Sequence, residues 1–218
     1  MSTLKERSAA VLAFLRASYP DAHCALHFRN DYECLFAIAL SAQTTDASVN
    51  RATPALFAAY PDVEAMAKAT PEEVRPYIAS LGLSGTKAKN LVAASKAIVE
   101  RFHSQIPTEI QDLTSLPGIG WKTANVYRLE RLSIPAIPVD THVHRLSVRL
   151  GLAKEKDSLL EVQRKLEHLF PKEDWHFVHL ALITHGRVLC KAAHPLCEEC
   201  GLSGVCPHFK KTSSIKGR

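Results

Sequence analysis

The stretch LPGIGWKTA, residues 116–124, places two glycines one residue apart between a proline and a lysine. A short helix that ends near Leu116 and a new helix that begins near Lys122 would form a helix-hairpin-helix. Gly118 and Gly120 permit positive φ angles and let backbone N–H groups approach a partner closely. N–H groups at a helix N-terminus bind anions such as a phosphate. The stretch therefore predicts a phosphate-binding hairpin, and a tight turn between two packed helices is the alternative.

Lys122 falls in the first turn of the second predicted helix. The helix dipole and partial desolvation both disfavour a charged amine there, so the lysine is a candidate nucleophile. The alternative is an exposed lysine that binds phosphate as a point charge. Asp140 begins the next helical run, in PVDTHVHRL, and suits an N-cap. A carboxylate there also suits an acid or base beside the amine. His142 follows within one turn and is a further candidate, whereas His144 favours packing.

Helical signals dominate the rest of the chain, and strand-like alternation is nearly absent. Capping boxes are predicted at four pairs, Thr3–Glu6, Asn30–Glu33, Thr70–Glu73 and Ser158–Glu161. Apolar residues at helical spacing predict a helix that ends at Pro20 and helices over 87–102, 123–132, 141–150, 158–169 and 175–189. The fold class is therefore all-α. LSIPAIPVD, residues 132–140, contains two prolines that favour extended backbone, so it is the expected crossing between two helical lobes.

The bulk composition is that of an ordinary globular protein. The 218 residues are 46% hydrophobic and 22% charged, with a net charge of +5, which fits an anionic partner. No run of about 18 apolar residues predicts a membrane span. The N-terminus MSTLKERSAA lacks an apolar signal region, so we expect a cytoplasmic protein, nucleoid-associated when bound to DNA. Nothing in the sequence indicates oligomerisation, and a monomer is expected.

Four cysteines crowd the last part of the chain with the spacing Cys190-x6-Cys197-x2-Cys200-x5-Cys206. In an intracellular chain such a cluster predicts metal binding rather than disulfides. One C-x2-C pair with unequal outer arms suits zinc poorly, because zinc ribbons carry two such pairs. The spacing also differs from the bacterial ferredoxin run. The cysteines therefore predict a metal site of another kind.

Taken together, these motifs resemble the endonuclease III family of DNA glycosylases, in which this cysteine spacing holds a [4Fe–4S] cluster. The resemblance runs from about Tyr32 to Pro207. LSAQTTD (40–46) resembles the loop whose glutamine, here Gln43, fills the space of a flipped nucleotide. LGLSGTKAKN (81–90) resembles the loop whose apolar residue, here Leu83, wedges into the base stack. The hairpin and VDTH match the segments of the family's catalytic lysine and aspartate, and HGR (185–187) also fits.

The resemblance implies a two-lobed fold with duplex DNA bound across the cleft between the lobes. A six-helix barrel lobe over 24–134 would carry the hairpin, and residues 1–23 with 135–218 would form the iron–sulfur cluster lobe. Lys122 and Asp140 would be catalytic. DNA contacts are implied for a further set of residues, Gln43, Leu83, Gly118, Gly120, His142 and Lys191.

The implied activity is that of a DNA glycosylase and abasic-site lyase on oxidised pyrimidines. The damaged base would be extruded from the stack, since its sugar carbon cannot be reached inside a duplex. Lys122 would attack that carbon and form a Schiff base, and β-elimination would cut the strand. Asp140 would take up the lysine's proton or stabilise positive charge on the sugar.

Several positions depart from the family pattern. Trp121 replaces a basic or polar residue, and Ser84 replaces a bulky one. The cysteine loop KAAHPL offers Lys191 and His194 where relatives carry more arginine and lysine. The helix after the hairpin is also more charged than usual, at Arg128, Glu130 and Arg131.

Other activities remain open. A thymine-mismatch glycosylase on the same scaffold would differ in pocket side chains. A non-catalytic protein that binds damage or senses redox state would keep the cluster without turnover, although Lys122 and Asp140 count against it. An adenine-excising activity is disfavoured, because the relative that has it normally lacks the lysine and carries an extra C-terminal domain. A plain zinc-binding helical protein would lack visible absorption.

Overall fold

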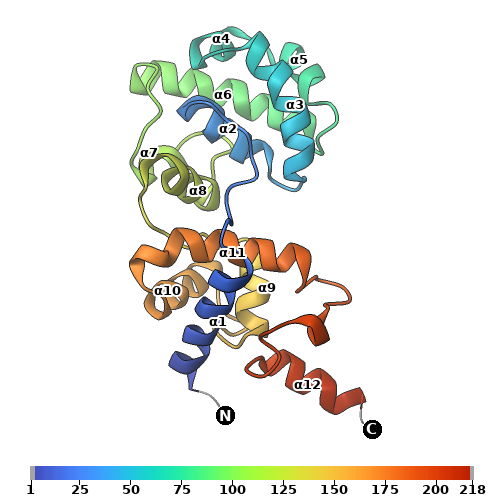
Figure 1. Ribbon diagram of the computed structural model, residues 1–218. Coiled ribbons are helices and arrows are strands. Elements are labelled where there is room, and N and C mark those ends of the chain that lie inside the picture. Colours follow the sequence, from blue (N-terminus) through green and yellow to red (C-terminus); the bar gives the residue numbers. More distant parts are fainter. Residues whose placement is uncertain (1–2, 217–218) are drawn as a thin grey trace. The chain divides into compact units, whose positions relative to one another are not determined.

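The computed structural model describes residues 3–216, and these residues form helices and connecting segments without a strand (Figure 1). The all-α prediction is therefore confirmed over this range. None of the helices in it has the length and apolar character needed to cross a membrane.

Local sequence signals account for most helix starts. α1 (Leu4–Ser18), α5 (Pro71–Val74) and α10 (Leu159–Leu169) each begin with the predicted capping box. In each box the N-cap hydroxyl accepts from a backbone N–H, and a glutamate reaches back to the N-cap. These three predictions are confirmed.

The fourth predicted box, at Asn30 and Glu33, forms only in part. Asn30 caps α2 (Asp31–Leu40) by accepting from Glu33 N at 2.9 Å. The Glu33 carboxylate instead accepts from Arg29 N at 2.8 Å and from the Arg29 guanidinium. A charged donor makes the stronger hydrogen bond, so arginine displaces the reciprocal half of the box.

Backbone contacts divide the chain into two compact units. One is Ala25–Ile134, here called the hairpin unit, and the other is Met1–Cys24 with Pro135–Arg218, called the cysteine unit. The hairpin unit runs through α2, α3 (Asp46–Ala59), α4 (Val63–Lys68), α5, η1 (Arg75–Ile78), α6 (Ser84–Phe102), α7 (Ile110–Thr114) and α8 (Trp121–Leu132). The cysteine unit runs through α1, α9 (Thr141–Arg149), α10, η2 (Lys172–Asp174), α11 (Trp175–Val188), η3 (Cys197–Glu199) and α12 (Pro207–Lys216).

In the hairpin unit, α2 lies at the centre and buries almost every residue, against α3 on one side and α8 on another. α6 packs along α4 and α5. Tyr127 of α8 and Phe36 of α2 are fully buried. This core fixes α8, whose N-terminus carries Lys122.

In the cysteine unit, α1 packs on α11, although the two helices are far apart in sequence (Figure 1). Val11 and Leu15 of α1 join a core with apolar residues of α9, α10 and α11. Leu202, between two of the cysteines, is buried in the same core. The cysteine segment is thus attached to the helices by its own apolar side chain.

Candidate active site and cysteine hollow

The predicted helix-hairpin-helix is present as α7, residues 115–120 and α8. Gly118 has a φ of +78°, in the left-handed region that favours glycine. A Cβ atom at Gly118 would also lie 2.7 Å from the Asn90 side chain. Both constraints require glycine at this position, and the close contact joins the hairpin to α6.

Gly120 differs from Gly118 in its backbone conformation. Its φ is −87°, which any residue can adopt, so the positive φ that glycine permits is not used here. A Cβ atom would meet nothing within 4 Å. Gly120 is the N-cap of α8 and supplies no side-chain hydrogen bond. Its absent side chain therefore leaves the first-turn N–H groups of α8 open to an outside partner.

Lys122 is the second residue of α8, and its side chain is exposed. The expected partial desolvation is therefore not provided by the hairpin unit itself. Trp121 precedes it and is 50% exposed, which is unusual for so large an apolar side chain. Asn125 donates to the Trp121 carbonyl at 2.9 Å and steadies this turn. An amine and an indole thus stand side by side in sequence at the open end of α8.

Gln43 and Leu83 lie on two loops of the hairpin unit and share an uncommon backbone conformation. Their φ angles are 54° and 60°, in the left-handed region that is unfavourable for residues with a Cβ atom. A Cβ atom on Gly82 would lie 3.9 Å from the Gln43 carbonyl oxygen, so the two loops are neighbours. Leu83 is 60% exposed. The backbone thus holds an amide and an apolar side chain out from adjacent loops.

Asp140 is the N-cap of α9, as predicted, and accepts from Val143 N at 2.8 Å. Asp140 is half-buried, and the hydrogen bond to Val143 N holds its carboxylate against its own helix. His142 packs against Gly186, where a Cβ atom would lie 2.8 Å from its Nδ1. Arg145 Nη2 lies 3.2 Å from the same Nδ1. The pKa of His142 is lowered mainly because burial disfavours the charged ring. The negative charge of Asp140 acts in the opposite direction and raises it.

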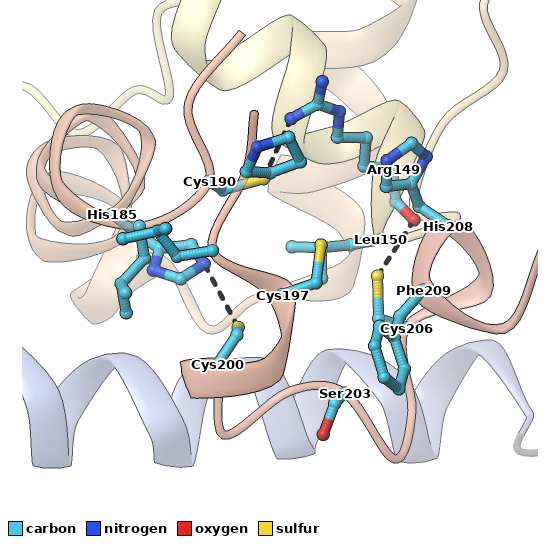
Figure 2. Close-up of a pocket in the computed structure, with 13 residues that line it drawn as sticks. Arg149, Leu150, His185, Cys190, Cys197, Cys200, Ser203, Cys206, His208 and Phe209 are labelled. Atoms are coloured by element: carbon cyan, nitrogen blue, oxygen red, sulfur yellow. Dashed lines mark hydrogen bonds between the residues drawn. The ribbon is translucent and has the colours of Figure 1, made fainter. Parts of the chain in front are cut away.

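The four cysteines of the motif line one hollow of the cysteine unit (Figure 2). Arg149 of α9 fixes its rim, because its guanidinium donates to the carbonyls of Lys191 at 2.7 Å and Ala192 at 2.9 Å. The same guanidinium lies 3.4 Å from Cys190 Sγ. Lys191, a predicted DNA contact, is exposed on the loop that Arg149 holds.

The chemistry of this donor set fits an iron–sulfur cluster. Burial raises the pKa of the Cys200 thiol, and the three other thiols raise it further because thiolates repel one another. Four crowded thiolates need a cationic group, and iron–sulfur clusters are held by such a set of four cysteines. Within the residues that the structure describes, no three His, Cys, Asp or Glu side chains could hold one metal ion. A [4Fe–4S] cluster does not need several side chains around one metal ion, since each of its four irons takes a separate thiolate.

Sequence reasoning assigned no role to His185 of the HGR motif. His185 is 1% exposed, and its Nε2 lies 3.7 Å from Cys200 Sγ (Figure 2). Burial lowers the pKa of His185 to about 4, so the ring is neutral. A histidine five residues before the first cysteine of a metal motif is the signal that could have found it.

Lys87 of α6 is another residue that the sequence provides no reason to single out. It is 8% exposed and lines a small pocket with Asn90 and Gly118. Among the described residues, its amine has no hydrogen-bond partner, and burial lowers its pKa. A lysine next to apolar positions of an amphipathic helix carries no such signal, because most lysines extend to solvent.

Comparisons with known proteins agree with this geometry. The model of the HhH-GPD superfamily of base excision DNA repair proteins matches residues 36–172. Endonuclease III of Synechocystis sp. is 43% identical over 208 residues, which are 95% of this chain and 94% of that protein. Endonuclease III of Bacillus subtilis is 46% identical over 193 residues, 88% of each protein.

Solved structures extend the comparison to three dimensions. The structure of a trapped endonuclease III–DNA covalent intermediate has a TM-score of 0.94 at 40% identity, over 98% of this chain and 100% of that one. A thermostable thymine-DNA glycosylase has a TM-score of 0.82 at 23% identity, over 95% and 97%, which shows a common fold alone.

A helix-hairpin-helix on an all-α scaffold, with these matches, defines a base excision DNA repair protein of the HhH-GPD superfamily. Within that superfamily the chain belongs to the endonuclease III family. It is a DNA glycosylase with abasic-site lyase activity, and the resemblance expected from its motifs is confirmed.

Proposed function

We propose that this chain binds duplex DNA that contains oxidised pyrimidines or abasic sites, removes the damaged base and cleaves the strand through a lysine Schiff base. The observation that carries the proposal is the open end of α8. Gly120 leaves the first-turn N–H groups uncapped by a side chain, and the exposed amine of Lys122 follows two residues later. A DNA phosphate bound at these N–H groups would bring a neighbouring sugar near the amine of Lys122.

Lys122 is the proposed nucleophile. Its amine nitrogen would bond to the sugar's anomeric carbon while the bond from that carbon to the base breaks. The base would leave with the bonding electrons. Because the amine is exposed in the hairpin unit, bound DNA rather than the protein core would desolvate it. Asp140 would take up the proton that the amine loses or stabilise positive charge on the sugar.

The neighbouring loops suit the space that an extruded nucleotide leaves. Leu83 would enter the base stack, and the Gln43 amide would occupy the gap with its hydrogen-bonding groups. Both side chains extend from backbone in the left-handed region, and the two loops are adjacent. His142, Lys191, Gly118 and Gly120 are the remaining proposed DNA contacts.

Cys190, Cys197, Cys200 and Cys206 are the proposed ligands of a [4Fe–4S] cluster. When bound, the cluster would support the loop of Lys191 and could exchange one electron. We further propose a cytoplasmic monomer, nucleoid-associated when bound to DNA. Sedimentation of the purified chain, free and with a short duplex, tests the oligomeric state.

A cleavage assay tests the substrate class. End-labelled duplexes would carry one thymine glycol, one G·T mismatch, one abasic site or no lesion. We expect cleavage at thymine glycol and at the abasic site, and none of the undamaged duplex. Preferential release of thymine from the mismatch would instead identify a thymine-mismatch glycosylase. Tight binding of the damaged duplexes without cleavage would identify a non-catalytic protein.

A further inference from the structure

Two side chains outside the proposed ligands form a chain that ends at Cys200. The hydroxyl of Tyr19, which follows α1, lies 2.9 Å from His185 Nδ1. The other ring nitrogen, Nε2, lies 3.7 Å from Cys200 Sγ (Figure 2). Tyr19 is separated from His185 by 166 positions in the sequence. The fold thus brings the N-terminal helix to the cysteine hollow through one histidine ring.

Aromatic packing holds this ring in place. Phe14 of α1 meets His185 edge-on, with ring centroids 5.3 Å apart, and meets Tyr19 in the same manner at 6.2 Å. A Cβ atom at Gly201 would lie 2.8 Å from the Phe14 ring. Glycine directly after Cys200 therefore allows Phe14 to approach the cysteine segment. The orientation of His185 is set by these contacts from two sides.

The direction of the hydrogen bonds follows from the two ends of the chain. A ligating thiolate carries no hydrogen and can only accept. The nitrogen that faces Cys200 must therefore carry the proton of the neutral ring. Nδ1 is then an acceptor, and the Tyr19 hydroxyl must donate to it. Of the two neutral tautomers of His185, only the one protonated at Nε2 allows hydrogen bonds both from the Tyr19 hydroxyl and to the Cys200 sulfur.

We propose that Tyr19 and His185 form a donor chain that makes an N–H···S hydrogen bond to the Cys200 ligand of the cluster and raises its reduction potential. A hydrogen bond withdraws negative charge from the sulfur and so favours the more reduced cluster. Tyr19 acts through His185 and is a positioning residue, since it fixes the tautomer. The inference rests on the proposed cluster and goes beyond it, because it assigns a function to Tyr19, which follows α1, and to His185 of α11.

The first test examines the wild-type full chain purified with its cluster. Two-bond proton–nitrogen NMR on protein with 15N-labelled histidine reports the tautomer of each ring, and His185→Gln assigns the signal. We expect a His185 ring protonated at Nε2, with a hyperfine-shifted proton because it contacts a paramagnetic cluster. A ring protonated at Nδ1, or a His185 signal without a hyperfine shift, would overturn the inference.

The second test measures the reduction potential by voltammetry in Tyr19→Phe. Loss of the hydroxyl frees the tautomer, so we expect a shift to lower potential than in the wild type. Tyr32→Phe is the matched control, because it removes a tyrosine hydroxyl that donates to the Tyr60 carbonyl at 2.9 Å in the hairpin unit. A Tyr19→Phe potential equal to that of this control and of the wild type contradicts the inference.

Failure of the inference can be separated from failure of the proposed function. A purified wild-type chain without iron–sulfur absorption would overturn the cluster proposal and this inference with it. A loaded cluster with an unshifted potential would overturn the inference alone. Strand cleavage is scored independently on the same preparations and reports on Lys122 rather than on Tyr19.

Discussion

In the hairpin unit, the proposed functional side chains of Gln43, Leu83 and Lys122 are exposed and extend from loops or from an uncapped helix end. In the cysteine unit, by contrast, the sulfurs of Cys190 and Cys200 lie 3.4 Å and 3.7 Å from side-chain nitrogens of other elements. The first arrangement is open to a partner, and the second is held by the protein itself.

The two regions should therefore respond differently to substitution, one mainly in activity and the other mainly in stability. Exposed side chains contribute little to folding, so substitutions at the hairpin end should change activity more than stability. Buried hydrogen-bonded groups stabilise the fold, so substitutions at the cysteine end should change stability first.

Asp140→Asn should lower activity strongly with little effect on stability. Asparagine keeps the oxygen that accepts from Val143 N at 2.8 Å, and it is as good an N-cap as aspartate. It loses the negative charge and the ability to take up a proton. We expect single-turnover base excision to fall about 10²–10⁴-fold. Urea denaturation should show an unchanged midpoint, and a variant with full excision activity would remove Asp140 from the reaction.

Gly118→Ala and Gly120→Ala should separate two roles within one hairpin. At Gly118 the left-handed φ and the 2.7 Å approach to Asn90 predict a destabilisation of about 3 kcal/mol. At Gly120 the same change should alter stability by less than about 1 kcal/mol, because the space is open. It should nevertheless weaken DNA binding, which fluorescence anisotropy on a short duplex measures. Equal destabilisation by both substitutions would contradict the assignment.

Arg149→Gln should affect the cysteine end alone. The guanidinium bonds to the carbonyls of Lys191 and Ala192 would be lost, and because both contacts are exposed to solvent the local cost should be about 1 kcal/mol. Hydrogen exchange should therefore become faster in residues 190–197 and stay unchanged in α8. Arg164→Gln, on α10 of the same unit, is the charge-matched control. Faster exchange throughout the hairpin unit would contradict the claim that Arg149 acts on the cysteine end alone.

Leu83→Gly should weaken DNA binding without lowering the stability of the fold. Glycine adopts the φ of 60° without strain and suits an N-cap, so stability should be unchanged or rise by up to about 1 kcal/mol. Loss of the exposed leucine should weaken binding to damaged duplex roughly tenfold, since burying a leucine side chain contributes ~1.5–3 kcal/mol. Reduced stability with unchanged binding would show that Leu83 serves the fold instead.

The sequence predicted features that depend on neighbouring residues. The capping boxes at Thr3, Thr70 and Ser158 and the N-cap at Asp140 all formed, because each joins groups within one helical turn. α6 begins at Ser84 rather than at Lys87, since Leu83 takes the N-cap position in a left-handed conformation without a polar cap. Propensity gives no warning of such a backbone.

Features that depend on distant contacts could not be read from the sequence. The contacts from His185 to Tyr19 and from Arg149 to Lys191 join segments that only the folded core brings together. The glycine motif alone could not distinguish Gly118, where glycine is required, from Gly120, where it is not. The requirement at Gly118 comes from its left-handed φ and from the close approach of Asn90 of α6. The hairpin and its lysine were thus predictable, and the groups that hold them were not.

Borohydride trapping on an end-labelled duplex with one thymine glycol tests whether Lys122 forms the Schiff base. Reduction of the Schiff base would convert the reaction intermediate into a stable covalent protein–DNA complex. Lys122→Gln removes the proposed nucleophile, and Lys89→Gln, at an exposed lysine of α6, is the matched control. We expect a covalent complex with the wild type and with Lys89→Gln, and none with Lys122→Gln. A complex that persists in Lys122→Gln, or its absence in the wild type on both this duplex and an abasic one, would contradict this expectation.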